Sequence, residues 1–144
     1  MPGYSGTPLA RKLGIKDNFR AALLHVPDEV KTALRDALGK CRIQSFRGQT
    51  SKDKDLDFIF LFVKSRAGLE LELMPAAKAL APAGMLWISW PKKSSGVATD
   101  LTGDVVRQSG LDAGLVDIKV CAVTEVWSGL KFVIPVKNRP KARR

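Results

Sequence analysis

The sequence has few of the residues from which metal sites and disulfide frameworks are built. Its 144 residues include two cysteines, Cys41 and Cys121, and a single histidine, His25. The cysteine spacing matches no metal-ligand pattern, and two cysteines do not make a disulfide framework. We expect both thiols to be free in a reducing compartment and no metal to be bound.

Long apolar runs are also missing. The longest ones, 58–63 and 85–89, are far too short to span a bilayer. The first residues include Pro2 and Gly3 and lack the basic-then-apolar pattern of a signal peptide. We therefore expect a cytoplasmic protein without a membrane partner.

Acidic residues are scarce relative to basic ones: 14 against 24, for a formal net charge of +10. A charged terminus without apolar periodicity favours disorder, so residues 1–136 are predicted to be one domain and 137–144 a basic disordered tail. The tail either improves solubility or binds nucleic acid through salt-sensitive contacts. Its basic residues are Lys137, Arg139, Lys141, Arg143 and Arg144.

The apolar residues that are present predict alternating strands and helices in a chain long enough to bury its own core. Strands are expected at 21–26, 41–46, 57–63, 85–90, 116–122 and 130–136, and helices at 8–14, 28–38, 65–80 and 102–113. Pro75 predicts a kink or two short helices within 65–80, although the alternation of Leu69, Leu71 and Leu73 also fits a strand.

Turns and loops complete this pattern. We expect turns at 82–84 and near 128–129, and a mobile polar loop at 47–55. Repeated strand–helix crossovers imply a parallel sheet, and the last two strands imply a hairpin. The predicted fold is a single Rossmann-like, three-layer α/β domain with a mostly parallel sheet and a C-terminal antiparallel hairpin.

The most informative stretch is 86–100, where an apolar strand ends at Pro91 and opens into a loop bearing lysine, serine and glycine. Ligands of open α/β sheets usually bind outside the carboxyl ends of the strands. That edge is rich in cations, which focus potential and attract anions, while serine and glycine supply donors for phosphate or carboxylate. The predicted ligand-binding residues are Lys92, Lys93, Ser94, Ser95, Gly96, Thr99, Asp100, Arg47, Lys64, Arg66 and Trp90. The alternative is a solvated basic rim without a ligand.

No catalytic constellation accompanies this loop. Lys92 and Lys93 precede Gly96, so the loop is not a P-loop. His25 could be a general base, but it fits a packed strand-end residue equally well. The loop hydroxyls lack an activating partner apart from a lysine. We predict no catalytic residue.

Three pairs of strings resemble a bacterial family of short domains of unknown function. They are YSGTPL at 4–9 with KLG at 12–14, WPKK at 90–93 with SGVATDLT at 95–102, and KVCAV at 119–123 with WSGL at 127–130. The resemblance extends over the chain apart from the loop near 48–55 and the tail. It implies a family and no transferable activity.

The order of elements resembles, more loosely, a degenerate class I methyltransferase core. The APAGMLW string at 81–87 is similar to the proline-glycine turn and fourth strand of those enzymes, and the closing hairpin fits as well. The resemblance implies a glycine-rich turn after the first strand and an acidic residue after the second, both for S-adenosylmethionine. This chain has LHVPD at 24–28 and QSFR at 44–47 instead.

These observations favour a non-catalytic binding or regulatory module, without a resident cofactor, that takes an anionic small molecule at the carboxyl edge of the sheet. A small methyltransferase-like enzyme that uses S-adenosylmethionine is the first alternative. A protein that binds nucleic acid through the basic edge and the tail is the second.

Overall fold

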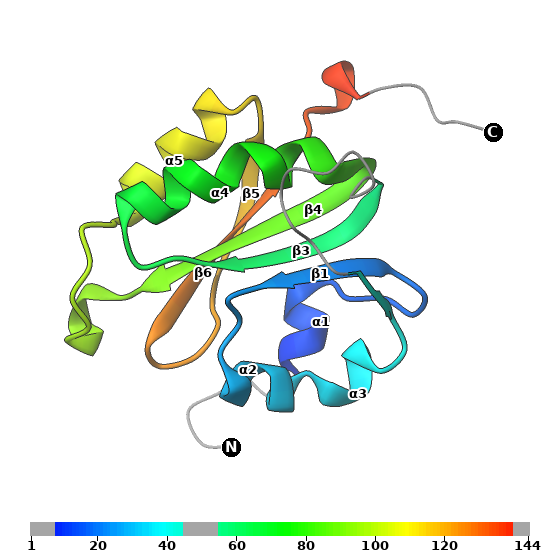
Figure 1. The fold of residues 1–144 in the computed structure, drawn as a ribbon, viewed down its shortest axis with the longest axis horizontal. Coiled ribbons are helices and arrows are strands. Elements are labelled where there is room, and N and C mark those ends of the chain that lie inside the picture. Colours follow the sequence, from blue (N-terminus) through cyan, green and yellow to red (C-terminus); the bar gives the residue numbers. More distant parts are fainter. Residues whose placement is uncertain (1–7, 45–54, 140–144) are drawn as a thin grey trace.

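The computed structural model describes residues 8–44 and 55–139. They form a six-stranded sheet flanked by helices on both faces (Figure 1). The elements are α1 (Leu9–Leu13), β1 (Arg20–Leu24), α2 (Asp28–Ala33), α3 (Arg35–Leu38), β2 (Arg42–Ile43), β3 (Leu56–Phe62), α4 (Arg66–Ala79), β4 (Leu80–Pro91), the 3-10 helix η1 (Lys93–Ser95), α5 (Gly103–Asp112), β5 (Val116–Ala122), β6 (Trp127–Val133) and the 3-10 helix η2 (Val136–Asn138).

The strand order is β2-β1-β3-β4-β6-β5. β2, β1, β3 and β4 are parallel, while β6 runs antiparallel to both β4 and β5. This arrangement confirms the predicted Rossmann-like α/β domain with a mostly parallel sheet and a closing antiparallel hairpin. The parallel pairs require crossovers, which the helices between the strands provide.

Two apolar cores lie on the two faces of the sheet. Figure 1 shows α4 and α5 on one side of the sheet and α1, α2 and α3 on the other. Alternation along β4 divides the two cores: Leu86 and Ile88 belong to the core beneath α4 and α5, and Trp87 to the core beneath α1. The Trp87 indole donates a hydrogen bond to the Leu13 carbonyl at 2.9 Å. This bond satisfies a buried N–H group and ties α1 to the sheet.

Local capping signals in the sequence set several helix ends. The Thr102 side chain accepts a hydrogen bond from Val105 N and begins α5, and Ser65 does the same for α4 through Gly68 N. Gly14 ends α1 with a φ of +82°, the left-handed conformation that glycine adopts without steric cost. The predicted helix starts at Ser65 and Thr102 are therefore confirmed.

Of the alternatives predicted for 65–80, two short helices and a strand are wrong, because α4 is one 14-residue helix that contains Pro75. A kink at Pro75 stays a prediction. Leu69, Leu73 and Ala76 are buried on a single face of α4, and this packing outweighs the local effect of the proline. The Leu71 side chain, on the opposite side, is 72% exposed.

Two predicted turns lie elsewhere. Residues 82–84 belong to β4, whose pairing with β3 passes from Leu56–Leu80 directly to Phe58–Met85, so β4 bulges here. A Cβ on Gly84 would lie 2.4 Å from the Leu56 carbonyl oxygen, so only glycine fits this approach. The second turn precedes 128–129, because β6 already begins at Trp127.

The loop 47–55 and the tail are described only in part. Residue 55 and residues 137–139 are described, whereas 45–54 and 140–144 lie outside the described residues. Within the tail that we predicted to be disordered, Lys137 and Asn138 belong to η2, and Arg139 Nε donates to the Ile134 carbonyl at 2.9 Å. The domain boundary at residue 136 stays a prediction. Within the described ranges, no helix is long and apolar enough to cross a membrane.

Candidate functional site

A cavity of about 580 Å³ opens where β1 and β3 end side by side. The chain leaves β1 through α2 and α3 toward β2, and it leaves β3 through α4 toward β4, on the other side. Such a point of diverging crossovers is the usual ligand site of open α/β sheets. The lining residues are His25, Pro27, Glu29, Phe62, Val63, Lys64, Gly68, Glu72, Val97, Val126 and Trp127.

His25 lies at the mouth of this cavity, directly after β1. Its φ of +61° is in the left-handed region, which a non-glycine side chain adopts at a steric cost. Its Nε2 shares a hydrogen bond with Glu72 Oε2 from α4. The exposed fractions are 61% for the His25 side chain and 24% for that of Glu72, so the pair joins β1 to α4 close to solvent.

The inner wall of the cavity is apolar and aromatic. Phe62, at the end of β3, and Trp127, at the start of β6, contact each other edge-to-face with ring centroids 4.8 Å apart. Both side chains are largely buried, and Val63 extends the same wall. Such a wall suits a ring or another flat apolar group of a ligand.

The loop at 92–100, which the sequence predicted to bind a ligand, forms one side of the cavity through Val97. Lys92 N donates to the Val126 carbonyl at 2.8 Å, which joins this loop to the β5–β6 turn. The Thr99 hydroxyl donates to the Lys64 carbonyl at 2.6 Å. The loop is therefore attached to both neighbouring segments of the cavity rim.

Two further side chains of the loop are engaged within the protein. Asp100 Oδ1 accepts a hydrogen bond from Arg66 N at 2.8 Å, at the first residue of α4. A carboxylate is stabilised there by the partial positive charge of the helix N-terminus. Ser95 Oγ donates to the Lys92 carbonyl at 2.6 Å and accepts from Val97 N at 3.1 Å. Ser95, Thr99 and Asp100 thus shape the loop.

The other predicted site residues are spread over several environments. Lys64 lines the cavity, while Lys93 and Ser94 are exposed on η1 and Gly96 takes a φ of +81° beside them. Trp90 was expected at the rim, but it is 7% exposed and packs in the core beneath α4 and α5. Arg47 lies outside the described residues.

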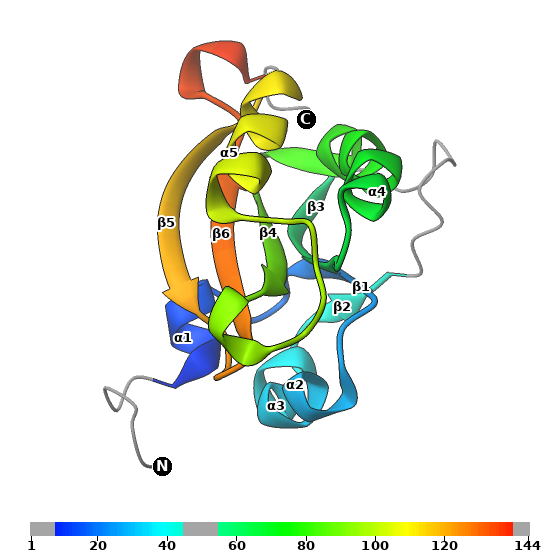
Figure 2. The same ribbon diagram turned by 90° about the vertical axis from the view of Figure 1, so that its left-hand side faces the viewer.

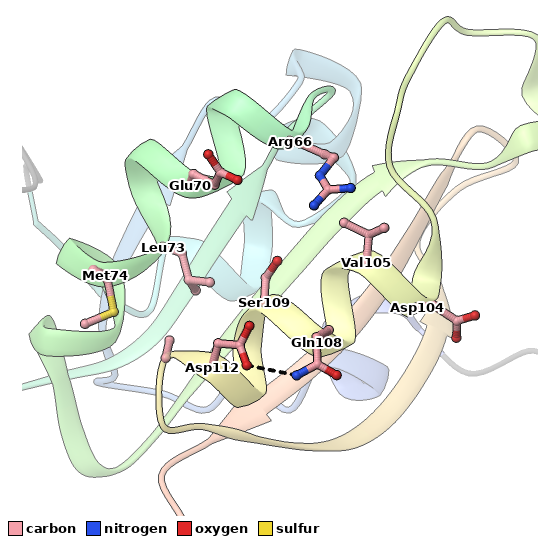
Figure 3. A pocket seen from close by; sticks show the side chains of 10 residues that line it. Arg66, Glu70, Leu73, Met74, Asp104, Val105, Gln108, Ser109 and Asp112 are labelled. Atoms are coloured by element: carbon pink, nitrogen blue, oxygen red, sulfur yellow. Dashed lines mark hydrogen bonds between the residues drawn. The ribbon is translucent and has the colours of Figure 1, made fainter.

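Arg66 points into a different cavity, of about 620 Å³, between α4 and α5 (Figure 3). Its floor includes Leu73 and Val105, and Gln108 Nε2 donates to Asp112 Oδ1 at 2.8 Å along its edge. This second cavity lies between the two helices and not at the strand ends. The predicted cationic edge is thus divided, because α4 turns Arg66 away from Lys64.

Sequence reasoning missed Glu72, Phe62, Val126 and Trp127 as neighbours in one cavity. No local pattern identifies them, because they come from α4, β3, the β5–β6 turn and β6. Within the described residues, no group of three or more histidine, cysteine, aspartate or glutamate side chains could hold a metal ion.

Solved structures of S-adenosylmethionine-dependent methyltransferases share this fold. A TehB-like methyltransferase from Corynebacterium glutamicum matches with a TM-score of 0.55 and 12% identity over 92% of this chain and 90% of that one. Magnesium protoporphyrin IX methyltransferase from Synechocystis, with bound S-adenosylmethionine, matches with 0.57 and 10% over 88% and 74%. An O-methyltransferase from Thermotoga maritima matches with 0.56 and 12% over 92% and 65%.

At these identities the similarity shows a methyltransferase-like Rossmann fold and nothing about activity. Comparison with curated proteins finds no match. A family model described as a protein of unknown function, DUF3052, matches residues 10–136, which confirms the resemblance to a family of short domains. With nearly its whole length matched, the chain belongs to the DUF3052 family.

Proposed function

We propose that the protein is a non-catalytic binding module whose ligand is a small molecule with a flat apolar part and an anionic group. The cavity at the ends of β1 and β3 is the proposed site. The observation that carries this proposal is that a loop attached to two neighbouring segments forms one side of a cavity at the switch point of the sheet.

The cavity offers different chemistry at its two ends. Phe62 and Trp127 line the inner wall, where a ring would be desolvated. Lys64 lines the rim. Lys92 is adjacent to the rim, because its backbone N–H donates to the carbonyl of Val126, another lining residue. An anionic group of the ligand is therefore expected at Lys64 and away from the Glu72 carboxylate, which would repel it.

Binding without catalysis is supported by the turn after β1. Cofactor-binding Rossmann folds place glycine there, so that backbone N–H groups approach a phosphate or carboxylate closely. Here His25 occupies the left-handed position and Pro27 has no N–H to donate.

A thermal-shift panel tests the proposal. The probes are adenosine 5′-monophosphate, benzoate, S-adenosylmethionine and S-adenosylhomocysteine, with adenosine as the uncharged control. A probe at about 100 times its dissociation constant adds roughly 2.7 kcal/mol to the unfolding free energy. Lys64→Glu should abolish the shift, whereas Lys78→Glu, an exposed change on α4, should leave it unchanged. Equal shifts for both variants would refute the site.

A second candidate is a methyltransferase-like enzyme. The fold favours it, because structures that share the fold include one solved with S-adenosylmethionine. In that case S-adenosylmethionine and S-adenosylhomocysteine should give the largest shifts of the panel, and labelled methyl groups should appear in an acceptor from a cell extract. Binding of adenosine 5′-monophosphate or benzoate alone would favour the non-catalytic module.

A further inference from the structure

Two lysines face each other across the terminal hairpin. Lys119 on β5 is the direct antiparallel partner of Lys131 on β6. Directly opposed like charges destabilise a sheet. Lys119 is exposed, whereas Lys131 is half-buried, so less water screens the charge of Lys131. The hairpin therefore holds two ammonium groups at a position where like charges repel.

The end of α1 brings further lysines to the same place. Lys119 Nζ donates to the Lys12 carbonyl at 3.1 Å. Lys131 Nζ lies 3.8 Å from the point that a Cβ on Gly14 would occupy. Lys16 follows two residues later and is close enough to disfavour the charged form of Lys131. We call Lys12, Lys16, Lys119 and Lys131 the α1 lysine cluster.

Within the described ranges, no carboxylate forms an ion pair with Lys16, Lys119 or Lys131. Burial lowers the pKa of Lys131 from the usual 10.5, and the charges of Lys119 and Lys16 lower it further. A bound anion would offset the repulsion between these ammonium groups. Relief of that repulsion would contribute to the binding free energy of the anion.

We propose that the α1 lysine cluster binds a compact, multiply charged anion of the phosphate class. The site lies on the face of the sheet opposite α4 and α5, as the position of α1 in Figure 2 shows. It is separate from the cavity at the ends of β1 and β3, because none of its lysines lines that cavity. Several ammonium groups around one half-buried lysine fit clustered phosphate oxygens better than an extended strand.

A purely structural role explains only part of the cluster. Cations stabilise the C-terminal end of a helix, and the bond from Lys119 to the Lys12 carbonyl is of this kind. Among the described residues, neither the Lys131 nor the Lys16 ammonium group has a hydrogen-bond acceptor. The ammonium groups of Lys131 and Lys16 are thus the ones that a bound anion would supply with a partner.

Calorimetric titration with inorganic tripolyphosphate tests the proposal on the full chain. The double variant Lys119→Gln and Lys131→Gln should bind at least about tenfold more weakly, since one lost charge-assisted hydrogen bond accounts for such a factor. The matched control, Lys31→Gln with Lys78→Gln, removes the same charge from exposed positions on α2 and α4 and should bind as the wild type does. Absence of binding to the wild type, or equal loss in both double variants, would overturn the proposal.

Cys121 provides a second readout at the site. Burial raises the pKa of its thiol, while the charges of Lys12 and Lys119 act in the opposite direction. In a Cys41→Ser chain, tripolyphosphate should slow alkylation of Cys121 by iodoacetamide. An unchanged rate at saturating tripolyphosphate would place the anion elsewhere and contradict the site.

A short oligothymidylate distinguishes a small phosphate ligand from nucleic acid. It should bind more weakly than tripolyphosphate, and tripolyphosphate should displace it. If the wild-type chain binds the oligothymidylate tightly and does not bind tripolyphosphate, the proposal of a compact site is wrong. An extended nucleic-acid surface would then be indicated.

Discussion

His25, which follows β1 with a positive φ, pairs through Nε2 with the Glu72 carboxylate of α4, 47 residues further along the chain. The pair connects the end of β1 to α4, and both residues line the switch-point cavity. It also places an imidazole where cofactor-binding relatives of the fold place glycine. The His25 side chain therefore lies at the mouth of the cavity, and its left-handed backbone conformation has a steric cost.

Two substitutions of His25 separate the effect of its left-handed backbone strain from the effect of its contact with Glu72. His25→Gly should change the unfolding free energy by less than about 1 kcal/mol, because relief of the left-handed strain offsets the loss of an exposed side-chain hydrogen bond. His25→Val retains the strain and adds a β-branched side chain, so it should destabilise by more than about 1 kcal/mol. Urea unfolding measures both, and equal effects of the two variants would contradict the strain.

Gly110 and Gly103, both in α5, form a matched pair. A Cβ on Gly110 would lie 2.1 Å from Phe132 Cε1, and Phe132 is fully buried, so Gly110→Ala should destabilise by about 2 kcal/mol. A Cβ on Gly103 meets only Trp90 Cζ2 at 3.6 Å. Gly103→Ala should be neutral or stabilise by up to about 1 kcal/mol. Thermal unfolding should rank the variants in this order, and the reverse order would refute the packing at Phe132.

Ser89 lies in the core with an unsatisfied hydroxyl. Its side chain is 0% exposed, and among the described residues its Oγ has no hydrogen-bond partner. A buried polar group without a partner costs about 1–3 kcal/mol, so Ser89→Ala should be neutral or stabilising despite the smaller side chain. The exposed change Ser94→Ala is the control. Marked destabilisation by Ser89→Ala in urea would indicate a partner for the hydroxyl.

The anchor of the 92–100 loop rests on the Thr99 hydroxyl, which donates to the Lys64 carbonyl and accepts from Leu101 N at 3.1 Å. Thr99→Val keeps the shape of the side chain and removes both bonds, so it should destabilise by about 1 kcal/mol and speed amide exchange at Leu101. Thr99→Ser retains the hydroxyl and should behave as the wild type. Slow exchange at Leu101 in the valine variant would refute the anchor.

Lys131 should limit stability at low salt. Lys131→Gln removes one charge of the opposed pair with Lys119 and should stabilise by about 0.5 kcal/mol, less at high ionic strength. The pKa of Lys131 is lowered in the folded protein, so the unfolded chain binds more protons as pH approaches 10.5. The unfavourable contribution of Lys131 to the unfolding free energy should therefore fade toward that pH, and the advantage of Lys131→Gln over the wild type should shrink. A pH-independent advantage in thermal unfolding would contradict this.

Features with local causes were predictable from the sequence. The caps at Ser65 and Thr102 and the end of α1 at Gly14 depend on side chains or backbone freedom within three residues. The strand at Val116–Ala122 follows from apolar alternation. The fold class followed as well, because alternating strands and helices admit few arrangements.

Features that depend on distant residues were not predictable. Trp90 was expected at the end of its strand, but β6 pairs with β4 as far as Pro91 and carries Trp90 into the core. The bulge at 82–84 depends on the approach of Gly84 to Leu56, and no local signal reveals that contact.

The sequence by itself determined the class of fold, the family and the presence of a polar loop after β4, since periodicity and turn chemistry act over a few residues. Only the tertiary structure decided which charges meet. Sheet pairing placed Lys131 opposite Lys119, and helix packing turned Glu72 toward His25 and Arg66 away from Lys64. The physical reason is that electrostatic interactions act through space, between groups whose separation along the chain carries no information about their distance.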